Sequence, residues 1–383
     1  MAPPKAPVYV DTDDALSRLC EQLQRQTAVA VDTESNPLFA YRERLCLVQI
    51  STERRDYLID PLAGVDLALL SPVFADPGVV KVLHDAEFDV LMLRRVHPFE
   101  FSSIFDTKVA ATALGIARVG LAPMLQEFFG VTADKKYQRS DWGRRPLSDE
   151  QIEYAALDTR HLIAMATELR VRLHEVGEPA VLEVAAECRR LCGLSPEPRK
   201  FDPDEFVRIK GVESLGDRSQ QALRELYRMR HHIADRRDVP AFKILSNDML
   251  FAVARARPKD QAALQKVRPI SPKLARRYGE SILEAVARAD KLGGLKRLPR
   301  KKTELSGLSD AERDLYEDLR AWRKRKARAR PTDSSLVLSR GRLAELARLK
   351  RKPKTVEQLA ETGLLEPWRV ALYGEELVAV LNK

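Results

Sequence analysis

Two carboxylates end the first strongly apolar segment of the chain. Asp32 and Glu34 follow the run Ala-Val-Ala-Val at 28–31. Residues two apart in an extended strand point to the same side, so these carboxylates would repel each other without a counter-charge. Mg²⁺ prefers carboxylate oxygens, and a divalent cation is therefore a natural partner. An exposed strand end with solvated acids is the alternative, and this spacing taken alone favours it.

A second pair of chemically capable residues lies on a predicted helix. Ser148 and Gln151 have the spacing of a capping box, which predicts a helix from 148 to about 173. Tyr154 and Asp158 are four apart and therefore share one side of that helix. Because apolar residues surround them, Asp158 needs a polar or cationic partner. An ordinary ion pair on the helix surface would also provide one.

A further acid follows a later strand. His84 ends the apolar run 79–83, and Asp89 lies five residues further on, in a segment with helical spacing. Asp85 and Glu87 are competing acids in the same passage. A lone acid at such a place usually complements the helix dipole. Asp89 therefore gains a chemical role only in combination with the other two sites.

The elements that must position these residues belong to an α/β domain. In the first half of the chain, short apolar runs alternate with helical patterns, which indicates helices packed on a sheet. Strands are predicted at 28–31, 45–50, 57–59 and 79–83, and helices at 66–74, at 87–96, at 148–173 and from a cap at 11–13 to about 26. The close spacing of the first three strands favours antiparallel pairing there, so we expect a mixed sheet.

The second half of the chain has a different pattern. A Pro-containing polar segment at 194–200 predicts a linker, and helical patterns follow it. A weak internal repeat is present. Its first copy has Ile-Leu-Ser at 244–246 and Tyr-Gly-Glu at 278–280, and its second copy has Val-Leu-Ser at 337–339 and Tyr-Gly-Glu at 373–375. Two related small helical domains explain this repeat, joined by a Gly- and Lys/Arg-rich segment at 293–302.

The composition restricts the class of function. The chain has 383 residues of which 44% are hydrophobic, so wholesale disorder is excluded. No apolar run approaches the roughly 20 residues of a membrane helix, and no signal peptide is evident, so we expect a cytoplasmic protein without a membrane partner. The net charge of +9 favours a polyanion, nucleic acid first and a membrane surface second, although a merely basic protein is the alternative. Four scattered cysteines do not indicate a disulfide framework.

The three acidic sites, taken together with the residues around them, resemble the DEDDy exonucleases and among them ribonuclease D. The matching segments are Val-Asp-Thr-Glu at 31–34, Leu-Cys-Leu-Val-Gln-Ile at 45–50, Phe-Asp-Thr at 105–107 and the run 134–147 continued by 154–158. The two helical repeats resemble HRDC domains. The resemblance implies an RNase H-like exonuclease domain with a mixed sheet at 1–195, a linker at 196–209, all-α HRDC domains at 210–290 and 309–383, and a basic linker at 291–308.

The resemblance also implies a role for each acid. Four carboxylates would hold two divalent ions, Mg²⁺ or Mn²⁺. Asp32 would lie between the two ions. Glu34 and Asp158 would bind the ion on the side of the nucleophile, and Asp89 would bind the second ion. Tyr154 would orient the attacking water, since a phenol with a pKa near 10 is a weak base at neutral pH.

Contacts to the substrate are predicted beside the acids and in the basic loop that precedes the helix at 148. The residues are Thr33, His84, Phe88, Lys135 and Arg139, with Arg144 and Arg145 as further phosphate-binding candidates. A core position is the alternative for Phe88, and simple solvation is the alternative for the cations of the loop.

We therefore expect a metal-dependent 3′→5′ exoribonuclease that acts as a monomer on RNA with a 3′ end and releases nucleoside 5′-monophosphates. The family implies tRNA precursors as its substrates. A DNA exonuclease and a non-catalytic RNA-binding scaffold on an inactive nuclease fold are the alternatives. Basic runs at 322–330 and 349–354 indicate that the HRDC pair holds RNA, with protein contact or a solvated basic face as the competing explanations.

Overall fold

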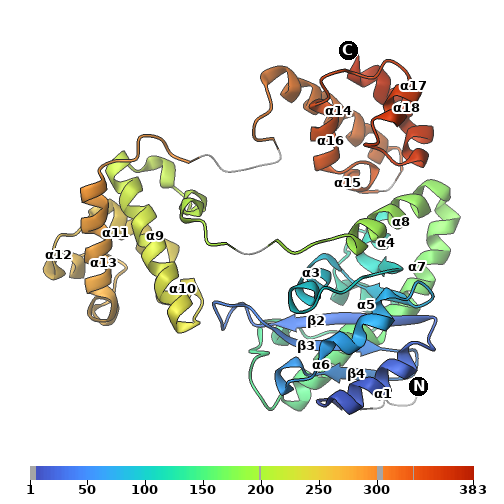
Figure 1. The fold of residues 1–383 in the computed structure, drawn as a ribbon, viewed down its shortest axis with the longest axis horizontal. Helices are drawn as coiled ribbons and strands as arrows, with labels where there is room; N and C mark the ends of the chain where they lie inside the picture. Colours follow the sequence, from blue (N-terminus) through green and yellow to red (C-terminus); the bar gives the residue numbers. More distant parts are fainter. Residues whose placement is uncertain (1–5, 198–199, 300–304, 331) are drawn as a thin grey trace. The chain divides into compact units, whose positions relative to one another are not determined.

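A mixed sheet forms the centre of the N-terminal part (Figure 1). The computed structural model describes residues 6–197, 200–299, 305–330 and 332–383. Within them the sheet has the order β1-β4-β3-β2-β5-β6. The strands are β1 (Val8–Val10), β2 (Ala28–Ser35), β3 (Leu45–Ser51), β4 (Asp56–Ile59), β5 (Val80–Leu83) and β6 (Ile104–Asp106). β3 and β4 are antiparallel, whereas β1–β4, β2–β5 and β5–β6 are parallel, which confirms the predicted mixed sheet.

Helices and short 3-10 turns surround this sheet. They are α1 (Asp13–Leu23), η1 (Pro61–Ala63), η2 (Leu67–Leu70), α2 (Ser71–Ala75), α3 (Glu87–Val96), α4 (Thr107–Ala113), α5 (Leu121–Phe129), η3 (Lys135–Arg139), α6 (Asp149–Arg160), α7 (Leu162–Val176) and α8 (Glu178–Cys192). The prediction of one helix over 148–173 is wrong, because the helix is interrupted at His161, between α6 and α7. There the backbone leaves regular helical geometry and the imidazole stacks on Phe129 at 5.0 Å.

The alternation of side chains along β2 decides which helices each of its residues meets. Val29 and Val31 join the core formed with α1, α2 and α3. Ala30 faces the other side and joins the core formed with α4, α7 and α8. Because side chains of a strand alternate, Asp32 and Glu34 continue the side of Ala30, and Thr33 continues the side of Val31.

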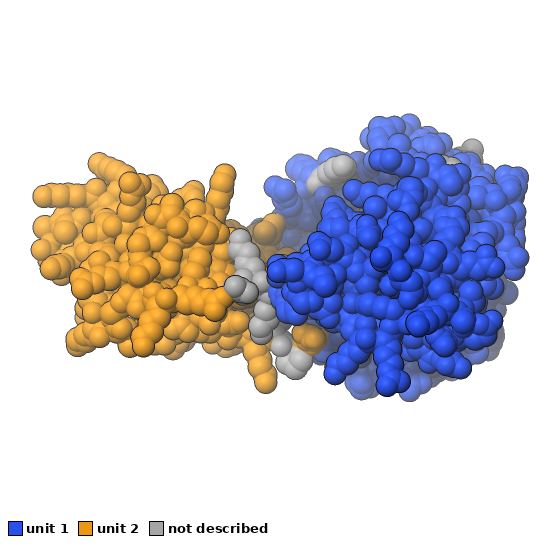
Figure 2. Space-filling view, turned by 90° about the horizontal axis from the view of Figure 1, so that it is seen from above, with its two compact units in different colours: residues 1–34, 45–196, 303–383 blue, residues 35–44, 197–302 orange. Residues whose placement is uncertain are grey.

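The chain divides into two compact units, coloured separately in Figure 2. The first unit contains residues 1–34, 45–196 and 303–383, and the second contains 35–44 and 197–302. The second unit holds η4 (Pro203–Arg208), η5 (Val212–Ser214), α9 (Asp217–Arg237), α10 (Ala241–Ile244), α11 (Asn247–Ala256), α12 (Gln261–Gln265) and α13 (Pro272–Leu292). The end of the first unit holds α14 (Asp310–Arg328), α15 (Ser334–Val337), α16 (Arg340–Ala347), α17 (Val356–Glu361) and α18 (Pro367–Leu381). We call α9–α13 the first helical repeat and α14–α18 the second.

Within the second unit, the segment 35–44 packs on the first helical repeat. The Tyr41 hydroxyl lies 3.1 Å from Nδ1 of His231, and the backbone N–H of Arg42 donates to Asp238 at 2.9 Å. The ammonium of Lys243 lies 4.4 Å from the ring centre of Phe39. This segment directly follows Glu34, the last acid of β2.

Within the first unit, the second helical repeat packs on α8. Leu336 of α15 joins the core that includes Val184 and Cys188 of α8. The wholly buried Glu183 forms an ion pair with Arg330, and the Tyr373 hydroxyl lies 3.4 Å from the same carboxylate. Among the described residues, no helix has both the length and the apolar character that a membrane span requires.

Candidate active site

Three of the predicted acids meet at the end of β2. Asp32 and Glu34 project from that strand, and Asp158 projects from α6. One carboxylate oxygen from each lies within 4.8 Å of the others. The two patterns that the sequence shows far apart therefore form one acidic cluster. Asp158 is buried, while Asp32 and Glu34 are half-buried and so remain accessible.

Asp89 adjoins this cluster from α3. Its Oδ1 accepts a hydrogen bond of 2.5 Å from the hydroxyl of Thr33, and both side chains are buried. Burial, and then the charge of Asp32, raise the pKa of Asp89. Asp89 does not belong to the group of three acids whose oxygens lie within 4.8 Å of one another. Its hydrogen bond with Thr33 links it to β2, the strand that carries Asp32 and Glu34.

The competing acid Asp85 is arranged differently. Its carboxylate is exposed and paired with Lys108. Its backbone adopts φ of 67°, a left-handed conformation that few residues other than glycine take up. This turn redirects the chain from β5 into α3, so that Asp89 and not Asp85 faces β2. Glu87, the other competitor, is exposed and paired with Arg190.

Burial raises the pKa of all four acids, and the charges of neighbouring carboxylates raise it further in Glu34, Asp89 and Asp158. Burial raises the pKa of Asp32 to about 7. Burial, followed by the charges of Asp32 and Asp158, raises the pKa of Glu34 to about 10. The pKa values of Asp89 and Asp158 also lie well above the usual range, mainly through burial and then through Asp32. In the described part of the chain, no Lys or Arg forms an ion pair with these carboxylates, so the cluster lacks a protein counter-charge.

This set of groups fits a divalent cation. All the donors are hard carboxylate oxygens, which suit Mg²⁺ or Mn²⁺ rather than metals that prefer sulfur or imidazole. A bound cation would offset the repulsion among these carboxylates and favour their ionised forms in this buried position.

Tyr154 lies one turn before Asp158 on α6 and is half-buried. Burial, and then the charges of Asp158 and Glu34, raise its pKa far above the ordinary value for a phenol. Its hydroxyl therefore stays protonated at neutral pH and can donate a hydrogen bond toward the acidic cluster. The ring packs between Trp142 and Tyr137, each with its ring centre 6.0 Å away, which limits the motion of the side chain.

A buried polar network fixes α6 against the sheet and was not predicted from the sequence. Ser51, at the end of β3, lies 2.6 Å from the hydroxyl of Thr159 and donates to Asp56 at 2.7 Å. Arg160 forms an ion pair with the same Asp56 at 2.7 Å. Thr159 and Arg160 directly follow Asp158, so the network sets the position of that carboxylate.

Asp106 performs a similar task for α3. It lies in the Phe-Asp-Thr segment at the end of β6 and is 2% exposed. Its carboxylate accepts hydrogen bonds from the backbone of Lys108 at 2.8 Å, which caps α4, and from that of Ala86 at 2.8 Å. The second bond holds the turn after β5 that leads to Asp89.

The predicted substrate contacts have varied surroundings. Phe88 is 44% exposed and so is not a core residue. His84 lies 2.9 Å from the Thr107 hydroxyl, and burial lowers its pKa to about 4, so the imidazole is neutral. Thr33 points to Asp89, as described above. Arg139 is exposed on η3, and the side chain of Lys135 lies outside the described part of the structure.

The two remaining cations of the loop also differ from each other. Arg144 is exposed. The guanidinium of Arg145 forms an ion pair of 2.6 Å with Asp60 and donates to the carbonyl of Cys46 at 2.7 Å. Arg145 therefore anchors the loop on the sheet, and its predicted contact with phosphate is not supported.

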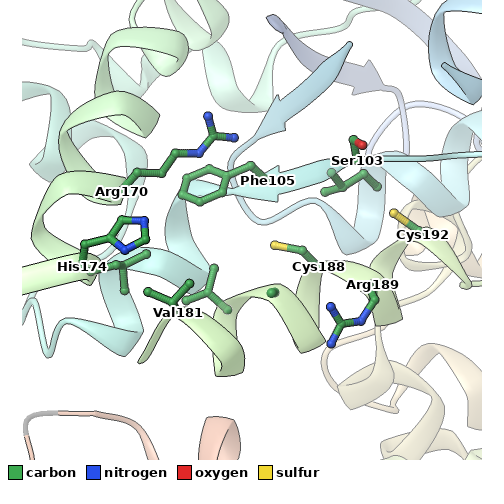
Figure 3. A pocket seen from close by; sticks show the side chains of 12 residues that line it. Ser103, Phe105, Arg170, His174, Val181, Cys188, Arg189 and Cys192 are labelled. Carbon is green, nitrogen blue, oxygen red and sulfur yellow. The ribbon is translucent and has the colours of Figure 1, made fainter. Parts of the chain in front are cut away.

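A separate cavity of about 340 Å³ lies between β6, α7 and α8 (Figure 3). Its walls are mainly apolar, and the guanidinium of Arg170 lies 4.5 Å from the ring centre of Phe105. No Asp or Glu is among the described residues that line it. The cavity therefore lacks the carboxylates that form the acidic cluster, and its polar lining includes the imidazole of His174 and the thiols of Cys188 and Cys192.

Comparison with known proteins agrees with this arrangement. Residues 7–174 match the family model of a 3′-5′ exonuclease, and residues 219–286 and 312–381 each match an HRDC domain. Ribonuclease D of Gluconacetobacter diazotrophicus is 31% identical over 389 residues, which cover 98% of this chain and 92% of that protein. The chain belongs to the ribonuclease D family. The predicted exonuclease and HRDC resemblances are thereby confirmed.

Two further relatives define the extent of the likeness. The crystal structure of Escherichia coli RNase D, described as an exoribonuclease involved in structured RNA processing, aligns with 99% of each chain at a TM-score of 0.67 and 26% identity. The exosome complex exonuclease RRP6 of Saccharomyces cerevisiae is 33% identical over 267 residues, which are 66% of this chain but 36% of that protein. The chain thus spans about a third of that relative and nearly all of a ribonuclease D. All four acids and Tyr154 lie in the segment that matches the exonuclease model.

Proposed function

We propose that this protein is a metal-dependent 3′→5′ exoribonuclease that trims RNA 3′ ends and releases nucleoside 5′-monophosphates. We further propose tRNA precursors as its substrates, the cytoplasm as its location and the monomer as its working form. The observation that carries the proposal is the convergence of the acidic cluster with Asp89 and Tyr154 in a chain of the ribonuclease D family.

The metal-binding groups would be the four carboxylates Asp32, Glu34, Asp89 and Asp158. When bound, a pair of divalent cations would activate a water molecule and stabilise negative charge on the leaving 3′ oxygen. The strand places two of these carboxylates side by side, whereas α3 and α6 supply one each from opposite sides of β2. Thr33 holds Asp89 in place through its hydroxyl.

Tyr154 would orient the attacking water or a phosphate oxygen. Burial and the neighbouring carboxylates raise the pKa of the Tyr154 phenol, so we assign this hydroxyl the role of a hydrogen-bond donor. Trp142 and the α6 backbone hold the hydroxyl near Asp158. The exposed ring of Phe88, one residue before Asp89, offers a surface on which the terminal base could stack.

The test uses a 5′-labelled RNA with a free 3′ end, Mg²⁺ and a matched reaction with a chelator. We expect stepwise shortening from the 3′ end, 5′-mononucleotides as products and no reaction with the chelator. A DNA strand of the same sequence measures the preference for the sugar, because only RNA offers a 2′-hydroxyl. RNA that binds but is never shortened, under any divalent metal, would favour the scaffold alternative.

Asp89→Asn and Asp85→Asn form a matched pair for the site. Both remove one negative charge, and the two positions lie in the same passage of the chain. The first should abolish Mg²⁺-dependent cleavage, and the second should retain it, because Asp85 is exposed and paired with Lys108. Equal losses in both variants would contradict the assignment of Asp89.

A further inference from the structure

The two helical repeats have the same internal contacts, which allows their residues to be paired. A buried arginine in each repeat donates to the carbonyl that ends the following short helix: Arg230 to Leu245 at 3.0 Å and Arg323 to Leu338 at 2.7 Å. An offset of 93 residues relates both members of these pairs. Each repeat also has a glycine with a close neighbour, since a Cβ at Gly279 or at Gly374 would lie under 3 Å from a side chain.

Each repeat also contains a paired arginine and tyrosine. In the first repeat Arg237 donates to the Tyr278 hydroxyl at 3.1 Å. In the second repeat Arg330 donates to the Tyr373 hydroxyl, also at 3.1 Å. The offset of 93 residues relates the arginines, and an offset of 95 residues relates the tyrosines. The arginine–tyrosine hydrogen bond is therefore a feature that the two helical repeats share.

In the second repeat this pair holds an anion. The carboxylate of Glu183, from α8, forms an ion pair with Arg330 and lies 3.4 Å from the Tyr373 hydroxyl. Glu183 is wholly buried, so its charge depends on these partners. The geometry thus shows what kind of group the arginine–tyrosine pair accepts.

In the first repeat the tyrosine of this pair is buried, with 5% exposure, whereas its arginine is exposed and is joined by a second exposed cation. The guanidinium groups of Arg237 and Arg277 each lie 5.4 Å from the ring centre of Tyr278, and both arginines are exposed. At the position equivalent to Arg277 the second repeat has Leu372. Within the described ranges, neither arginine is ion-paired with a carboxylate.

The acids near this end of α9 already have other partners. Asp235 pairs with Arg42 at 2.9 Å, and Asp238 pairs with Arg44 at 2.5 Å. Both arginines belong to the segment 35–44 of the same compact unit. Asp235 and Asp238 are therefore engaged by Arg42 and Arg44 rather than by Arg237 or Arg277.

We propose that Arg237, Arg277 and Tyr278 form a phosphate-binding site for the RNA backbone on the first helical repeat. Two guanidinium groups and a hydroxyl donate several hydrogen bonds to one anion, and guanidinium matches phosphate as well as carboxylate geometry. RNA phosphate is favoured over an acidic peptide because the inference rests on the proposed exoribonuclease function and on the net charge of +9. In the second repeat the carboxylate of Glu183 occupies the equivalent place.

The test measures binding of a tRNA with a short 3′ extension to the full-length protein in an Asp32→Asn background, in which the RNA is not degraded. Arg237→Met and Arg277→Met are compared with Arg276→Met, which removes the same charge from the neighbouring exposed position of α13. Affinity is measured at several salt concentrations. Each site variant should bind roughly three- to tenfold more weakly, and the slope of log K against log salt should become less negative by about 0.7–0.9. Arg276→Met should change affinity less than twofold and leave the slope unaltered.

Two further variants separate binding from folding. Arg237→Lys keeps the charge but not the two-pronged donor, and should fall between wild type and Arg237→Met. Tyr278→Phe keeps the ring in the core and should weaken binding less than either arginine loss. Equal effects of Arg237→Met and Arg276→Met, or unchanged RNA affinity in both site variants, would overturn the proposal. Since binding needs no catalysis, an inactive wild-type enzyme would refute the proposed function without deciding this test.

Discussion

Replacing Arg330 by methionine would leave Glu183 as a buried charge without its cation. Glu183 has 0% side-chain exposure and Arg330 has 22%. Removing one partner of a buried ion pair costs about 3–5 kcal/mol. Because Arg330 is partly exposed and the Tyr373 hydroxyl remains beside the carboxylate, we expect the contact between α8 and the second repeat to weaken by about 2–3 kcal/mol at neutral pH.

The loss should depend on pH in a defined direction. Burial raises the pKa of Glu183, and Arg330 opposes that rise. Without Arg330 the pKa stands higher still, so the folded state binds a proton that the unfolded state releases. A carboxyl of this kind contributes stability at low pH and loses it as the pH rises through its folded pKa. Arg330→Met should therefore be less damaging at pH 5 than at pH 8.

Hydrogen exchange of the α8 amides measures this effect directly. A loss of about 2–3 kcal/mol corresponds to roughly 30- to 150-fold faster exchange where opening is at equilibrium. Arg237→Met is the matched control, because it removes the equivalent arginine from a repeat in which, among the described residues, no buried carboxylate pairs with that arginine. Adding Glu183→Gln to Arg330→Met should recover most of the protection. The reasoning fails if the two arginine variants lose equal protection in their own repeats, or if the loss is the same at pH 5 and pH 8.

Three further predictions concern the acidic cluster. Tyr154→Phe should lower kcat about 10- to 100-fold without changing the Mg²⁺-induced rise in Tm, and full activity would contradict its role as a donor. Asp158→Asn should abolish the Mg²⁺-induced rise in Tm. For the wild type, Mg²⁺ at 100 times its Kd should stabilise the folded state by about 2.7 kcal/mol. An undiminished rise in the variant would show that the cation binds elsewhere. Thr33→Val should leave Asp89 without its buried hydrogen-bond donor, which should lower the free energy of unfolding by about 1–3 kcal/mol and reduce activity. Thr33→Ser keeps the hydroxyl and should retain stability and activity. A Thr33→Val variant with wild-type kinetics and Tm would show that the hydrogen bond has no function.

Local patterns in the sequence predicted the acids that share an element. Alternation along β2 puts Asp32 and Glu34 on one side, and the capping box at Ser148 starts the helix on which Tyr154 and Asp158 share a face. Both features depend on residues within a few positions of each other. Their convergence needed the family resemblance, because no local pattern relates β2 to α6.

Features that depend on distant partners were not predictable in this way. Arg145 reads as a free cation in a polar loop, yet its partner Asp60 lies far away in the sequence. The Ser51–Thr159 contact is equally invisible, since both are common small polar residues. At the break the His161 ring stacks on Phe129 from another helix, and the apolar pattern of the sequence continues through it. Strands β1 and β6 have three residues each, too few to show a period.

The path of the chain between its two compact units limits how the protein can be dissected. The chain leaves the first unit directly after Glu34, returns at Leu45, and leaves again after Pro196. Cutting off everything beyond that last point would strip Phe39 and Tyr41 of their support and would expose the carboxylate of Glu183 at once. An isolated nuclease fragment is thus a damaged molecule rather than a minimal enzyme, and the contribution of each helical repeat is better measured by single substitutions in the intact chain.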